Sequence, residues 1–91
     1  MIRMFVRHSV SDFGTWKRNY DAFDRARREM GVAGDGVYQS IDDPLDVTIW
    51  HDFSSLQNAQ KFARSRRLAA AMEDAGVVGE PNIWFTTPPP V

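Results

Sequence analysis

Residues 47–53 read VTIWHDF, an apolar run that ends in an adjacent imidazole and carboxylate. Its first four residues are of types that suit a pleated, half-buried surface, so the stretch predicts a β-strand. His51 and Asp52 stand side by side near the end of that strand. The pair marks either a polar strand terminus or the edge of a reaction site.

Strand and helix patterns follow one another on both sides of this stretch. The predicted order is a strand at 2–10, a helix at 13–30, strands at 36–41 and 47–53, two helical segments between Ser54 and Gly76, and a strand at 82–87. Ser11 or Asp12 and Ser65 are the expected caps, and Gly31 and Gly76 the expected helix ends. This β-α-β-β-α-β order is typical of the ferredoxin-like fold, an α+β architecture with one four-stranded antiparallel sheet and its helices on one face.

The two central strands of this topology are expected at 2–10 and 47–53, parallel to each other and each followed by a helix. Side chains alternate along a strand, so His8 and His51 fall on the helix-covered face and Asp52 on the opposite one. His51 and Asp52 are therefore not expected to pair. With parallel strands, His8 and His51 are expected to be neighbours.

The other face of the sheet is predicted to be aromatic. It would carry Phe5, Tyr38, Trp50 and Trp84. Such a patch calls for a covering partner, and we expect a second copy of the chain. Arg3, Arg7 and Asp52 lie on the same face as interface or rim charges, and Arg7 could pair with Asp52. RNA-recognition modules of this topology instead carry a glycine and a basic leading residue in the signature of this strand, and VTIWHDF has neither.

Composition narrows the functional classes further. The chain has 91 residues, a formal charge of −1 and no cysteine. We expect one domain at 1–87 followed by a proline-rich tail at 88–91. The charge balance favours neither nucleic acid nor a membrane surface as partner, and without an apolar span or a secretory leader we expect a cytoplasmic protein.

His8 and His51 are the candidate catalytic residues. Imidazole titrates near neutral pH, so either residue suits a general base that deprotonates a phenol or an acidic C–H group. The alternative is structural, with each ring bonded to a loop carbonyl or a helix end. Two histidines alone make a poor metal site, so no metal is expected.

Aromatic and polar side chains near these histidines could form a substrate pocket. The candidate substrate-binding residues are Trp16, Tyr20, Phe23, Gln39 and Phe53. Aromatic residues at helical spacing are also what a hydrophobic core contains, so packing is the competing interpretation. Gln39 is a candidate because it is polar on an apolar strand face.

Three stretches resemble the antibiotic biosynthesis monooxygenase-like group of the dimeric α/β-barrel superfamily. They read VRHSVSDFGTWKRNYDAFD, DVTIWHDFSSLQNAQKFA and SRRLAAAMEDAGV, and together they cover most of the chain. The resemblance implies a homodimer whose two sheets form a barrel, with a pocket between sheet and helices in each protomer. Members of the group include cofactor-free oxygenases, polyketide cyclases and haem-degrading enzymes. The haem-degrading branch uses a histidine on the second helix, and this chain has none there.

Two functional hypotheses remain. The first is a small-molecule enzyme that resembles cofactor-free monooxygenases or polyketide cyclases, uses a histidine base in an apolar pocket and needs no cofactor. The second is a non-catalytic homodimer that binds a small aromatic or hydrophobic molecule or serves a structural role. Accessible imidazoles beside a cavity favour the first hypothesis, and sealed imidazoles favour the second.

Overall fold

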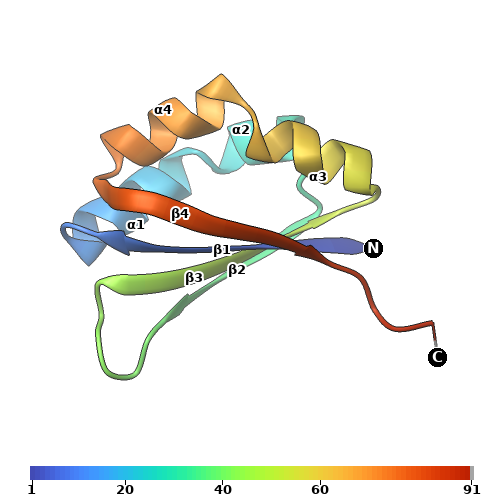
Figure 1. The fold of residues 1–91 in the computed structure, drawn as a ribbon. Coiled ribbons are helices and arrows are strands. Elements are labelled where there is room, and N and C mark those ends of the chain that lie inside the picture. The colour runs from blue at the N-terminus through green and yellow to red at the C-terminus, as the bar shows by residue number, and fades with distance from the viewer. Residues whose placement is uncertain (91) are drawn as a thin grey trace.

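The computed structural model describes residues 1–90, in which a four-stranded sheet carries all the helices on one face (Figure 1). The strands are β1 (Ile2–Val10), β2 (Gly34–Gln39), β3 (Asp46–Phe53) and β4 (Val77–Thr86), in the order β2-β3-β1-β4. The predicted ferredoxin-like arrangement is confirmed. Residues 88–90 of the predicted tail have no regular secondary structure, and residue 91 lies outside the described residues.

Each predicted helical region consists of two helices. The helices are α1 (Phe13–Ala22), α2 (Asp24–Glu29), α3 (Leu56–Ala63) and α4 (Arg66–Asp74). The break between α3 and α4 falls at Ser65, as predicted, and the Ser65 side chain caps α4. The break at Phe23 between α1 and α2 was not predicted. Among these helices, none is both long and apolar enough to span a membrane.

The prediction that the two central strands run parallel is wrong. β1 pairs with β3 in the antiparallel sense, so that Val6 lies opposite Ile49 but His8 lies opposite Val47. The physical reason is the path of the chain. The helical crossover after β1 returns the chain parallel to β1 in β2, and β3 is the hairpin partner that enters between them, antiparallel to both.

The core lies between the sheet and the helices. On strand β3 the burial alternates without exception from Asp46 to Phe53, with the even-numbered residues half-buried and the odd-numbered ones buried. The buried cluster includes Met4, Val6, Val47, Ile49 and Phe53 from the sheet and Trp16, Ala59, Phe62 and Leu68 from the helices. Strand alternation therefore assigned the two faces of β3 correctly.

The open face of the sheet is ordered by aromatic and charged contacts. Phe5 and Trp84 stack with their ring centroids 5.4 Å apart. The Trp50 ring covers Gly36, where a Cβ atom would collide with the indole, and the Arg3 guanidinium lies 3.8 Å from the Trp50 centroid. This packing fixes the aromatic side chains of the open face in place.

The ion pairs on this face differ from the predicted one. Arg3 forms two hydrogen bonds with Asp52, at 2.8 and 3.0 Å, while Arg7 forms two with Asp46, at 3.0 and 2.7 Å. The predicted pair of Arg7 and Asp52 is therefore wrong. It assumed parallel strands, whereas the antiparallel register places Arg3 opposite Asp52.

Candidate active site

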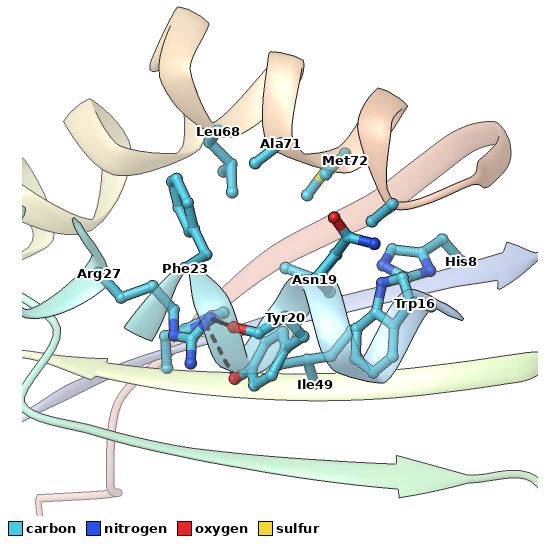
Figure 2. A pocket seen from close by; sticks show the side chains of 13 residues that line it. His8, Trp16, Asn19, Tyr20, Phe23, Arg27, Ile49, Leu68, Ala71 and Met72 are labelled. Atoms are coloured by element: carbon cyan, nitrogen blue, oxygen red, sulfur yellow. Dashed lines mark hydrogen bonds between the residues drawn. The ribbon is translucent and has the colours of Figure 1, made fainter. Parts of the chain in front are cut away.

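A cavity of about 50 Å³ lies between the sheet and the helices (Figure 2). Its walls are formed by Val6, His8, Ile49 and His51 of the sheet, by Trp16, Asn19, Tyr20, Phe23 and Arg27 of α1 and α2, and by Leu68, Ala71, Met72 and Ala75 at α4. In Figure 2, Leu68, Ala71 and Met72 descend from α4 toward the side chains of α1. The cavity is thus an apolar space with a few polar groups in its walls.

Both histidines line this one cavity, although the antiparallel strands keep them apart in the register. His8 lies opposite Val47, whereas His51 lies opposite Met4. Both side chains are buried, and the Nδ1 atom of each ring has no hydrogen-bond partner. The His8 ring meets the Trp16 ring edge-on at 5.7 Å.

His51 is the histidine with polar surroundings. Its Nε2 lies 3.5 Å from the hydroxyl of Tyr20, and that hydroxyl donates a hydrogen bond of 2.6 Å to Oδ2 of Asp35. Burial, together with the positive charge of Arg27, lowers the pKa of His51 to about 4. Burial lowers the pKa of His8 as well. Both rings are therefore neutral near pH 7, and His51 Nε2 faces a chain of two further proton-carrying groups.

Arg27 is the residue that sequence analysis missed. Its side chain is 3% exposed, and its guanidinium carbon lies 3.7 Å from the centroid of the Tyr20 ring. Nη2 lies 3.2 Å from Asp24 and 3.8 Å from Asp35, Nη1 donates to the Tyr20 carbonyl, and Nε has no partner. The spacing of Tyr20, Phe23 and Arg27 places all three on one helical face, a signal that could have identified this arginine.

The charges around Tyr20 hold each group in a defined protonation state. Burial and the hydrogen bond to Asp35 raise the pKa of the Tyr20 hydroxyl, so tyrosine keeps its proton. Burial acts to raise the pKa of Asp35, but the Tyr20 hydrogen bond and the charges of Arg27 and Arg28 outweigh it, and the net pKa is lowered. The resting site therefore contains a neutral imidazole, a neutral phenol and a carboxylate.

The predicted substrate-binding residues divide into two groups. Trp16, Tyr20 and Phe23 line the cavity. Gln39 does not, because it lies at the exposed end of β2 and donates a hydrogen bond of 3.1 Å to the Pro44 carbonyl. Phe53 is fully buried against Phe62, outside the cavity walls.

No metal-binding cluster is present among residues 1–90, since no three His, Cys, Asp or Glu side chains gather there.

No family model matches the sequence, and no curated protein sequence matches it significantly. Solved structures do match it. The chain has the fold of the antibiotic biosynthesis monooxygenase-like proteins.

One such neighbour is a provisionally named antibiotic biosynthesis monooxygenase from Bordetella bronchiseptica, with a TM-score of 0.83, 14% identity and coverage of 96% of this chain and 95% of the other. SnoaB, a cofactor-independent oxygenase from Streptomyces nogalater, gives a TM-score of 0.75 at 6% identity, covering 96% and 91%. A monooxygenase from the ActVA-Orf6 gene of Streptomyces coelicolor, solved with nanaomycin D, gives a TM-score of 0.70 at 21% identity, covering 99% and 88%. At these identities the neighbours establish the monooxygenase-like fold.

Proposed function

We propose that this protein is a cofactor-independent monooxygenase that oxidises a small, electron-rich phenolic substrate. The observation that supports the proposal is the neutral His51 imidazole, which lies in the wall of an apolar cavity with its Nε2 atom directed at Tyr20. Two fold neighbours, SnoaB and the ActVA-Orf6 monooxygenase, are oxygenases, and the second was solved with a small-molecule ligand.

In the proposed reaction, His51 Nε2 accepts a proton from a substrate O–H or activated C–H group. The electron-rich anion then transfers one electron to dioxygen, and the two radicals combine to form a peroxide. For a CH₂ group, loss of water from the protonated peroxide leaves a carbonyl. The substrate itself supplies the electrons, one oxygen atom enters the carbonyl, and the other leaves as water.

Arg27 gives this reaction its electrostatic support. An imidazole whose pKa is about 4 is a weak base toward a phenol, whose pKa is about 10. The buried guanidinium favours a negative charge in the cavity, and the imidazolium formed by the transfer attracts the new anion in a medium of low dielectric constant. Both effects stabilise the substrate anion and thereby oppose the repulsion of Arg27 for the imidazolium within the bound complex.

The size of the cavity limits how the substrate binds. About 50 Å³ is far less than the roughly 300–1,000 Å³ of pockets for drug-sized ligands. We propose that α4 moves outward when the substrate enters, and that the unbranched Met72 side chain adapts to the ring.

Oxygen uptake tests this proposal. We expect the purified protein, without added metal or cofactor, to consume oxygen with at least one member of a panel of hydroxylated anthrones and to release the corresponding anthraquinone. Product formation without oxygen uptake would indicate a cyclase or isomerase instead. Binding of the panel compounds without any turnover, followed by quenching of tryptophan fluorescence, would favour a non-catalytic ligand-binding protein.

We also propose that two copies associate through the open face of the sheet. Trp84, which stacks on Phe5, is 42% exposed on this face, and Tyr38 of the edge strand β2 is 64% exposed. Stable dimers commonly bury about 800 Å² per partner, an area that a four-stranded sheet face can supply. Removal of these rings from water would give the dimer its hydrophobic driving force.

Sedimentation tests the proposed association. We expect the protein to sediment as a dimer at micromolar concentration, and Trp84→Glu to shift it toward the monomer because a charge would be buried at the interface. Leu56→Glu provides a matched control, since Leu56 is 44% exposed but lies on α3, on the other side of the sheet. A monomeric wild-type protein would count against the dimer.

A further inference from the structure

We infer that Tyr20 and Asp35 form a proton relay that connects His51 in the cavity with solvent on the outer side of α1. The inference rests on the proposed function for its chemical use, because it gives the proton taken by His51 a route out of the cavity. The relay itself is a property of the resting protein and is testable without substrate.

The geometry brings three proton-carrying groups from three elements into one line of contacts. Tyr20 of α1 stands between His51 of β3 and Asp35 of β2. Its hydroxyl oxygen lies 3.5 Å from His51 Nε2 and 2.6 Å from Asp35 Oδ2. The other ring nitrogen of His51, Nδ1, is buried and has no partner. Proton exchange at His51 is therefore directed through Nε2 and the Tyr20 hydroxyl.

Tyr20 and Arg27 separate the cavity from the outer surface of the protein. Both residues line the inner cavity, and both also line a polar hollow on the outer surface, together with Lys17, Asp21 and Asp35. Asp35 is 18% exposed and also accepts a hydrogen bond of 2.8 Å from Arg28. The relay thus begins at a buried imidazole and ends at a carboxylate that reaches water.

Arg27 explains why the relay passes through Tyr20. Its guanidinium lies flat against the phenol ring, 3.7 Å from the centroid, and its Nη1 donates to the Tyr20 carbonyl. These contacts hold the ring in one orientation, with the hydroxyl between His51 and Asp35. The positive charge of Arg27 also disfavours a proton that stays on His51, as its lowering effect on the His51 pKa shows.

The transfer is balanced at every atom. The protonated His51 gives its Nε2 proton to the Tyr20 oxygen while the Tyr20 hydroxyl proton moves to Asp35 Oδ2. Asp35 then releases a proton to water in the outer hollow. When the peroxide needs a proton to leave as water, the same steps run in reverse and water supplies that proton through Asp35, so the relay has no net gain or loss of protons.

Exchange of the His51 Nε2 proton with water, followed by NMR on protein labelled with ¹⁵N-histidine near pH 5, where a fraction of the imidazole is protonated at both nitrogens, tests the relay. We expect Tyr20→Phe and Asp35→Asn each to slow this exchange by about tenfold or more, because each removes one proton carrier from the path. Structural loosening has the opposite sign, since local opening admits water and speeds exchange. Slower exchange is therefore a result that a merely structural role would not produce.

Asp24→Asn is the matched control. Asp24 lies 3.2 Å from both Arg27 and Arg28, so its removal perturbs the same charge cluster without interrupting the path. We expect its exchange rate to match that of the wild type. Unchanged or faster exchange in Tyr20→Phe would overturn the relay, and unchanged exchange in Asp35→Asn alone would remove Asp35 from it. Slowed exchange in a protein that oxidises none of the panel compounds would leave the relay standing and reject the proposed oxygenase.

Discussion

His51→Gln should lower the kcat for oxygen consumption by about 10²–10⁴-fold, the usual contribution of a general base. Glutamine keeps a hydrogen-bonding side chain of similar reach at this position of β3, but its amide does not accept a proton near neutral pH. The KM should change less than kcat, because the apolar walls that hold the ring are unaltered. Steady-state oxygen-electrode measurements at saturating substrate would determine both constants.

His8→Gln is the comparison that separates base catalysis from pocket shape. His8 lines the same cavity and is equally buried, but its ring contacts Trp16 and no proton carrier. We expect a loss of no more than about tenfold from the altered packing. Equal losses in the two variants would mean that neither imidazole acts as the base, and a larger loss in His8→Gln would move the base to His8.

The sequence was sufficient for the fold because each element carries its own local signal. Alternation on β3 set its buried and open faces, and Ser65 and Gly76 marked the start and end of α4. Strand direction carries no such local signal. It follows from the path of the whole chain, and the wrong direction for β3 also gave the wrong partners for Arg7 and His8.

The candidate site was only partly predictable. Trp16, Tyr20 and Phe23 line the cavity because their spacing defines a single helix face directed at the sheet. The prediction that Gln39 lines the cavity was wrong for a different reason. β2 is an edge strand, and no helix covers its carboxyl end. Side chains on both faces of the strand are exposed there, so the alternation of side chains no longer separates core from solvent.

The polar partners of His51 were the least predictable part of the site. Asp35 lies fifteen positions after Tyr20 in a glycine-rich segment, and its approach to the hydroxyl depends on the register of β2 with β3. Arg27 is one of four arginines between Arg18 and Arg28, and only the tertiary packing shows which of them is buried. Charged residues on a helix are usually solvated, so their burial is information that composition does not contain.

Mild acid should destabilise the protein through His51, before the carboxylates titrate. Its pKa is about 4 in the folded chain, against 6.5 for an unperturbed histidine, so between these values the unfolded chain binds a proton at this position and the folded chain does not. Unfolding is therefore favoured as the pH falls from about 6.5 to 4. The full difference corresponds to about 3 kcal/mol of unfolding free energy, and it is complete below pH 4.

Urea denaturation at pH 7.0 and 4.5, at one fixed protein concentration, measures this loss. We expect His51→Gln to lose about 2–3 kcal/mol less than the wild type between the two pH values, whatever its stability at pH 7.0, because glutamine does not titrate. Asp35 and Asp52, whose pKa values are lowered by their hydrogen-bonded partners, contribute mainly below this window. Burial lowers the pKa of His8 as well, so His8 also contributes to the loss of stability in acid. The same measurement on His8→Gln separates that contribution from the one made by His51. An equal loss of stability in His51→Gln and the wild type would show that the pKa of His51 is the same in the folded and the unfolded chain, and it would contradict the lowering of that pKa by burial.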